Sequence, residues 1–226
     1  DAVTSLRRVA PQIADQLVDA LLHPEQPFAV RRRIPRVLTG CPPQQAAEAL
    51  LEGLSDKRFE VRYQCGCALG VVAKQNPEIH FDPQLVFEAV QREATVDKKV
   101  WDTQQLLERG EQEYGSSFAG LVRDRTSRSL EHVFRLLALV LPKEPLQIAF
   151  RGLHTADENL RGIALEYLES VLPSSVREPL WTLLEDRRPA QRPVRPKEEV
   201  LATLMRSHHS IELNLAAMNK VPGREP

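Results

Sequence analysis

An internal repeat constrains the fold of this chain more than any other feature. The segment LLEGLSDKRFEVRYQCGCALG at residues 50–70 returns at 149–169 as AFRGLHTADENLRGIALEYLE. With one slack position in the turn, the two copies share matched pairs, which are Gly53-Leu54 and Gly152-Leu153, Asp56 and Asp157, and Val61-Arg62 and Leu160-Arg161. A repeat of this kind is typical of stacked helical hairpins, because one hairpin cannot bury its own apolar face.

A third copy lies upstream in LVDALLHPEQPFAVRRRIPRVLTGCP, where Val30-Arg31 is the aliphatic-arginine pair. Its turn carries Pro24 and Pro27 in place of Asp. Counted from the aliphatic residue of each copy, apolar residues recur 4, 8 and 11 positions later, at Ile34, Cys65, Ala164, Leu38, Leu69, Leu168, Cys41, Val72 and Val171. These offsets fall on one face of an α-helix, so each copy predicts a second helix with the same buried stripe.

The rest of the chain also favours helices. Apolar residues recur at helical spacing, whereas alternating runs and clusters of β-branched residues are scarce. Prolines follow the apolar helical segments at Pro42, Pro77, Pro142 and Pro173. A proline has no backbone N–H to donate, so it ends helix propagation at these positions. The sequence therefore predicts an all-α protein.

The repeat units resemble a known family. LLEGLSDKRFEVR and FRGLHTADENLR are similar to HEAT repeats in their short bacterial form, which have a first helix, an Asp in the turn and an aliphatic-arginine pair opening the second helix. This resemblance implies a right-handed α-α superhelix, an armadillo-like solenoid of stacked hairpins. It also implies a scaffold that binds other proteins rather than an enzyme.

The predicted solenoid occupies residues 1–186, with degenerate hairpins between three clear ones near 12–42, 44–76 and 145–172. One degenerate hairpin pairs PQLVFEAVQREA with TVDKKVWDTQQLL, where Trp101 takes the arginine position. Residues 108–117 are predicted to form a polar loop. A proline-rich linker over 187–197 then leads to a weak terminal repeat over 198–226, predicted as a hairpin.

A second resemblance covers roughly a fifth of the chain. Residues 129–173 look like the soluble HEAT region that follows the membrane part of some bacterial proteins related to ADP/ATP translocases. The resemblance implies a cytosolic appendage of a transporter-like membrane protein, with a neighbouring domain of the same parent chain as one possible partner. The chain begins with Asp1 rather than Met, which predicts a processed protein or a piece of a longer one.

Composition narrows the function classes. The formal net charge of -1 argues against a nucleic-acid binder, because phosphate binding normally requires a basic surface. The longest apolar run, LLALVL at 136–141, is far shorter than the ~20 residues that span a bilayer, so direct membrane insertion is not expected. Three cysteines without disulfide-framework spacing favour a reducing compartment, and we expect a cytoplasmic protein.

Candidate catalytic and metal-ligating residues are few. Cys65 and Cys67 are two positions apart and would point to different faces of a helix, which is not the geometry of a metal or redox pair. The pattern predicts that Cys41 and Cys65 are buried, and that Cys67 reaches solvent or a neighbouring repeat. His208-His209 lacks further ligands at metal-binding spacing, and phosphate-binding glycine loops are missing. We therefore expect no cofactor and no enzymatic activity.

The strongest charged feature is a basic strip, which consists of Arg31, Arg32, Arg33, Arg36, Arg58 and Arg62. It has two interpretations. As a functional site, the strip would bind an anion or an acidic partner, because second helices of stacked hairpins repeat their side chains along one face. As a structural feature, Arg31 and Arg62 hold the repeat position whose guanidinium bonds neighbouring turns, and the others are solvated charges.

An alternative function is a HEAT-fold nucleic-acid-binding protein or DNA glycosylase. In such an enzyme, Trp101 and Asp102 would hold an extruded base and Trp181 would form a second wall. The near-zero net charge and the absence of a spacing that ties these residues together argue against it. The sequence favours a non-catalytic scaffold whose partner is a protein or a neighbouring domain.

Overall fold

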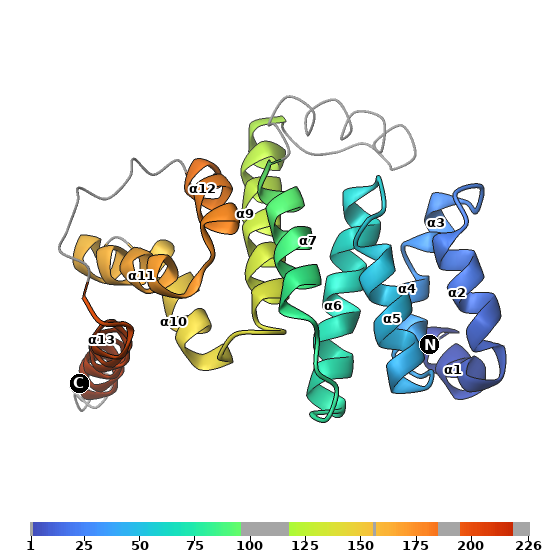
Figure 1. Cartoon of the computed structure of the whole chain (residues 1–226), viewed down its shortest axis with the longest axis horizontal. Coiled ribbons are helices and arrows are strands. Elements are labelled where there is room, and N and C mark those ends of the chain that lie inside the picture. The colour runs from blue at the N-terminus through green and yellow to red at the C-terminus, as the bar shows by residue number, and fades with distance from the viewer. Residues whose placement is uncertain (1, 96–117, 156, 185–194, 219–226) are drawn as a thin grey trace, which may run out of the picture. The chain divides into compact units, whose positions relative to one another are not determined.

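The computed structural model describes the backbone of residues 2–95, 118–155, 157–184 and 195–218. Every regular element in these ranges is a helix, which confirms the all-α prediction (Figure 1). The chain divides into two compact units, Asp1–Leu141 and Pro142–Pro226, called unit 1 and unit 2 below. No helix in the described ranges is both long enough and apolar enough to cross a membrane.

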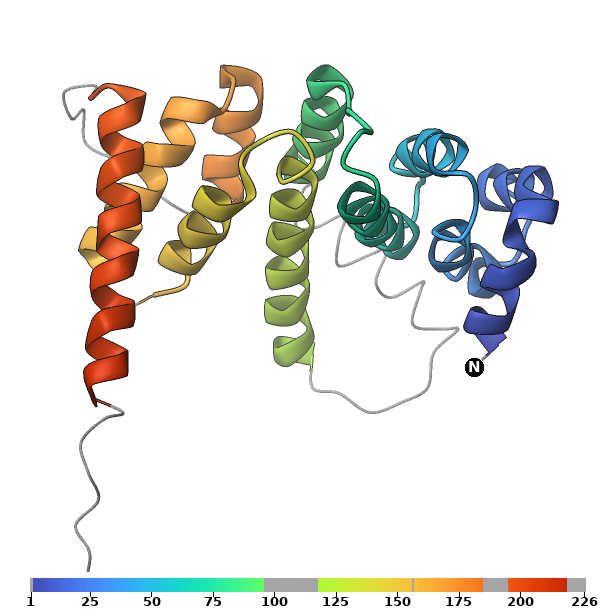
Figure 2. The same cartoon turned by 90° about the horizontal axis from the view of Figure 1, so that it is seen from below.

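The described part of unit 1 contains three helical pairs that pack one on the next. Its described helices are α1 (Ala2–Val9), the 3-10 helix η1 (Ala10–Ile13), α2 (Ala14–Leu22), α3 (Phe28–Arg31), α4 (Ile34–Leu38), α5 (Pro43–Gly53), α6 (Phe59–Gln75), α7 (Pro83–Thr95) and α9 (Phe118–Leu137). The pairs are α2 with α4, α5 with α6, and α7 with α9, and α5 and α6 also contact the pair before them (Figure 2). Stacking buries the leucines predicted on the stripe, Leu38 and Leu69, completely.

The second helix of the first repeat is interrupted, although the sequence predicted one continuous stripe from Val30. α3 ends at Arg31 and α4 begins at Ile34. Pro35 explains the break, because its ring would collide with a helical carbonyl four residues earlier and it has no N–H to donate. Val30, on the short α3, is 44% exposed, whereas the corresponding residues Val61 and Leu160 are buried.

The described helix that pairs with α7 is α9, which also packs against α6. The sequence had placed the second helix of this repeat at TVDKKVWDTQQLL, most of which lies outside the described residues. Leu130, Val133, Phe134 and Leu137 on α9 are buried, as their spacing of three and four residues predicted.

Unit 2 contains α10 (Lys143–Leu153), α11 (Glu158–Val171), α12 (Ser174–Leu183) and α13 (Lys197–Met218). α10 and α11 form the predicted hairpin, and α13 packs on both. The backbone of α13 is one continuous helix, so the predicted terminal hairpin is wrong. The reason is that neither Gly nor Pro lies between Lys197 and Met218 to break it.

The boundary between the compact units falls at Pro142, within the residues predicted as one solenoid over 1–186. The predicted linker at 187–197 lies largely outside the described residues, and its last residue, Lys197, begins α13. The helix predicted as a separate terminal repeat is therefore part of unit 2 through its contacts with α10 and α11.

The matched glycines and leucines have the same role in both repeats. A Cβ added at Gly53 would lie 2.6 Å from Cys65 Sγ, and one at Gly152 would lie 3.0 Å from Ala164 Cβ. Both partners occupy the position four residues after the aliphatic residue, so each glycine permits close approach of its two helices. Leu54 and Leu153 are 3% and 5% exposed, which confirms their predicted burial.

Candidate functional site

Arg31 bridges two successive repeats of unit 1. Its Nε donates to the Leu21 carbonyl at 2.9 Å, at the end of α2, and its guanidinium pairs with the Asp56 carboxylate in the α5–α6 turn. The other Asp56 oxygen accepts from the Arg58 backbone N–H at 2.8 Å. Because both side chains of the pair are almost fully buried, each depends on the other for its charge to be tolerated.

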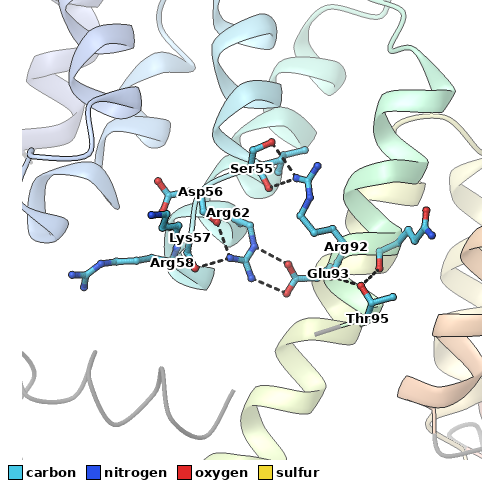
Figure 3. A network of polar contacts seen from close by, with 10 residues as sticks. Ser55, Asp56, Lys57, Arg58, Arg62, Arg92, Glu93 and Thr95 are labelled. Carbon is cyan, nitrogen blue, oxygen red and sulfur yellow. Dashed lines mark hydrogen bonds and ion pairs between the residues drawn. The ribbon is translucent and has the colours of Figure 1, made fainter. Parts of the chain in front are cut away.

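Arg62 repeats this arrangement one hairpin later (Figure 3). Its Nε lies 2.8 Å from Glu93 Oε2 on α7, and its terminal nitrogen donates to the carbonyls of Asp56 and Lys57 at 2.8 and 3.1 Å. Arg62 and Glu93 are 8% and 2% exposed. A buried guanidinium requires a full set of acceptors, and this one has them from its own turn and from the next helix.

Neighbouring contacts complete what we call the turn network, defined as Arg31, Asp56, Arg62, Arg92 and Glu93. Arg92 donates to the Leu54 carbonyl at 3.3 Å and to the Ser55 hydroxyl at 3.1 Å, beside the Arg62 pair in Figure 3. The network joins the carboxyl ends of α2 and α5 to the helices that follow them. It therefore holds the stacked pairs in register.

The repeat arginines bond to turn groups as predicted, with different acceptor atoms. The carbonyl of Asp56, not its carboxylate, accepts from Arg62. In unit 2, Arg161 donates to the Leu153 carbonyl at 2.7 Å. The Asp157 carboxylate instead accepts from the Asn159 and Leu160 N–H groups and caps the start of α11.

A second group of arginines faces outward from the interrupted α3–α4 segment. We call Arg32, Arg33 and Arg36 the exposed basic segment; Arg33 and Arg36 are exposed and Arg32 is half-buried. Among the residues that the structure describes, no carboxylate lies within ion-pair distance of any of the three. Their charge is therefore not neutralised within the described part of unit 1, unlike that of Arg31 and Arg62.

Two of these outward-facing arginines are oriented by their neighbours. The Arg32 guanidinium lies 5.3 Å from the centre of the Phe28 ring, which the Arg58 guanidinium approaches to 4.6 Å. Arg36 Nε donates to Gln64 Oε1 on α6 at 3.1 Å. The predicted basic strip thus separates into the ion-paired Arg31 and Arg62, Arg58 against the Phe28 ring, and the exposed basic segment.

The structure also brings together an α6–α9 cluster that the sequence analysis missed, which consists of Tyr63, Arg128, Glu131, His132 and Arg135. The Tyr63 hydroxyl donates to Glu131 at 3.2 Å, and the Arg128 guanidinium lies 4.5 Å from the Tyr63 ring. Arg128 pairs with Glu60 at 2.8 Å and Arg135 pairs with Glu131, so these charges balance. The signal was the spacing of Arg128, Glu131 and Arg135, which places them on one helix face.

His132 is the most strongly perturbed titratable group of this cluster. It is 1% exposed and its ring meets Phe59 edge-on, with centroids 5.9 Å apart. A Cβ at Gly66 would lie 2.6 Å from the His132 ring, so this glycine makes room for it. Burial, followed by the nearby positive charges of Arg62, Arg135 and Arg128, lowers the pKa of His132 to about 3. Its imidazole is therefore neutral at physiological pH.

The cysteines follow the sequence pattern. Cys41 and Cys65 are buried and Cys67 is half-buried beside Tyr63 and Arg135, as predicted. Burial raises the pKa of all three thiols, which keeps them protonated. Within the described ranges, no group of three His, Cys, Asp or Glu side chains is placed to hold a metal ion.

Most residues of the alternative nucleic-acid site lie outside the part of the chain that the structure describes. Trp101 and Asp102 lie outside the described residues, as do the side chains of His208 and His209. Trp181 is 7% exposed and belongs to the core of unit 2 on α12.

Comparison with known proteins returned no relative. No family model, no curated protein and no solved structure matches the chain.

Proposed function

We propose that this protein is a non-catalytic, HEAT-type helical-repeat scaffold that presents a surface of unit 1 to another protein or to a neighbouring domain of its parent chain. The recurrence of one packing scheme supports the repeat assignment. In the two clearest copies, a glycine contacts the residue at the same position of the second helix, and an arginine bonds carbonyls of the preceding turn. A stack of such units offers a rigid, extended surface.

The exposed basic segment is the observation that carries the binding role. Arg31 and Arg62 form ion pairs within the turn network. In contrast, the three arginines of the exposed basic segment have no carboxylate partner among the described residues. Three unneutralised cations on one short segment attract a partner of opposite charge. The rigid packing below them keeps their positions fixed when the partner binds.

The resemblance of residues 129–173 to translocase-associated HEAT regions supports a further element of the proposal. In this arrangement the scaffold is the cytosolic region of a transporter-like membrane protein. Its partner is then the neighbouring domain of that parent chain or a protein that associates with it.

The alternative is a HEAT-fold nucleic-acid-binding protein or DNA glycosylase, because unpaired arginines also suit phosphates. A mobility-shift titration with duplex DNA at low salt separates the two functions. We expect no shift. Tight association that weakens steeply as salt rises, and that charge reversal of Arg32, Arg33 and Arg36 to Glu abolishes, would overturn the scaffold proposal.

The triple charge reversal has to leave the fold intact for this test to be clear. These side chains lie outside the core, so we expect the chain to remain folded, with a loss in the free energy of unfolding of ~1 kcal/mol or less for each substitution. Urea unfolding followed by circular dichroism measures this change. Arg206→Glu, a single charge reversal at an exposed position of unit 2, is the control for charge reversal away from the segment.

A further inference from the structure

Two guanidinium groups of the exposed basic segment are held in fixed orientations, and this indicates the chemistry of the partner that they bind. The inference rests on the proposed scaffold function. We propose that Arg32 and Arg36 bind carboxylates of an acidic protein segment as two oriented guanidinium forks, with the exposed Arg33 as a third cation. The partner is thus a stretch of chain rich in Asp or Glu.

Arg32 is oriented by an aromatic ring. Its guanidinium lies 5.3 Å from the centre of Phe28, and a guanidinium over an aromatic face keeps its N–H groups directed outward for a ligand. Phe28 itself is 9% exposed and is contacted by Arg58 of the following turn at 4.6 Å. The ring that holds Arg32 is therefore fixed by the fold.

Arg36 is oriented through its Nε. That nitrogen donates to Gln64 Oε1 at 3.1 Å, and Gln64 Nε2 donates in turn to Glu60 Oε1 at 2.8 Å. Gln64 is 8% exposed, so it is a fixed acceptor rather than a mobile side chain. No described residue accepts from the terminal nitrogens of Arg36, which leaves its fork available.

The small number of unpaired cations, rather than the forks themselves, favours carboxylates of a protein over the phosphates of a duplex. A planar guanidinium binds one carboxylate through two parallel hydrogen bonds, and a prior orientation lowers the entropy lost on binding. Duplex binding normally draws on about six to ten phosphate contacts. The arginines beside the segment that pair with Asp56 and Glu93 are neutralised, so the unpaired positive charge at this place lies on the three arginines of the segment and on Arg7, whose Nε donates to the Arg36 carbonyl at 2.8 Å.

Fluorescence anisotropy with a labelled oligoglutamate peptide tests the proposal on the full chain. We expect saturable binding that an oligoglutamine peptide of equal length does not show. Charge reversal of Arg32, Arg33 and Arg36 to Glu should abolish this binding, whereas Arg206→Glu should preserve it. Absence of binding, or equal loss with both variants, would overturn the proposed site.

The double variant Arg32→Lys with Arg36→Lys separates oriented forks from simple charge attraction, because it preserves net charge. We expect it to weaken peptide binding about tenfold, since an ammonium group provides no bidentate fork and does not stack as guanidinium does. Arg33→Lys is the control and should retain wild-type affinity. If the double lysine variant bound as tightly as wild type, the fork geometry would be refuted.

The outcomes distinguish this inference from the scaffold function on which it rests. Failure of the peptide to bind, together with no DNA shift, overturns the acidic-segment partner and leaves a scaffold with a different partner. Tight DNA binding through the same arginines overturns both. Melting curves of each variant identify any loss of affinity that comes from unfolding.

Discussion

At the scale of single residues, the position of an arginine in the chain decides whether its guanidinium forms an ion pair inside the fold or lies at the surface. Arg31 and Arg32 are adjacent in the sequence, yet Arg31 is paired with Asp56 in the turn network and Arg32 stacks on Phe28 at the surface. Successive residues of a helix point about 100° apart, so neighbours necessarily meet different surroundings. Arg62 and Arg58 differ in the same way, because Arg62 is buried and paired with Glu93 whereas Arg58 lies against the Phe28 ring.

Arg62→Ala tests the structural half of this partition. It leaves Glu93 buried without its partner, and removal of one member of a buried pair is destabilising by ~3–5 kcal/mol. The free energy of unfolding from urea titrations measures the loss. Arg62→Met with Glu93→Leu removes both charges and should recover much of the stability. Arg33→Ala, at an exposed position, should change it little, and a comparable loss there would refute the structural assignment.

His132 predicts a specific pH dependence of stability. Its pKa is about 3 in the folded protein and near 6.5 when unfolded, so the unfolded chain binds the extra proton between these values. Stability should therefore decline as pH falls below about 6.5, by up to ~1.4 kcal/mol for each unit of the pKa difference. The free energy of unfolding measured between pH 7.5 and 4.5 shows this slope.

His132→Gln should flatten that slope, because the variant has no imidazole to protonate. The exposed His80→Gln in the same unit is the control and should retain the wild-type slope. An unchanged slope in His132→Gln would show that other groups dominate the acid response.

At the scale of helices, the repeat positions explain why two distant segments fold alike. Each first helix ends in a Gly-Leu pair, the glycine meets the second helix, and the leucine enters the core. The second helices then bury the residues at the +4 and +8 positions in all three copies. Close packing of this kind depends on residue size, so small changes are felt directly.

Leu54→Ala and Leu153→Ala should each lower the free energy of unfolding by ~2–5 kcal/mol, the usual effect of a cavity in the core. Leu85→Ala is the matched control, because Leu85 on α7 is 50% exposed. Its effect should be small. Equal losses at the buried and exposed leucines would contradict the repeat alignment.

At the scale of the whole molecule, the two compact units differ in how deeply their described charged and titratable groups are buried. Unit 1 contains the buried Arg62–Glu93 pair and the neutral His132. In unit 2 the described ion pairs of Arg195 and Arg177 involve partly exposed side chains. Among the contacts given for the described residues, unit 1 therefore has the more deeply buried groups that acid can protonate.

We expect unit 1 to lose protection before unit 2 when the protein is acidified. Pulsed hydrogen exchange after incubation at decreasing pH, resolved by peptide mass, reports on both units in one sample. Amides of α6 around Leu69 should become labelled at a higher pH than those of α11 around Leu168. The reverse order would contradict this account of acid sensitivity.

Local periodicity and residues such as Gly53 and Leu54 are enough to predict the helical class and most of the buried positions of the second helices, although Val30 is exposed and Val171 is half-buried. Tertiary structure decided the rest. The pairing of Arg62 with Glu93, and of Arg36 with Gln64, joins residues about thirty positions apart, which no local pattern specifies. The α6–α9 cluster likewise depends on how helices pack, whereas the break at Pro35 has a local cause in the proline ring. Periodicity tells which face of a helix is buried, but only the stacked neighbours decide which arginines find a carboxylate and which remain exposed.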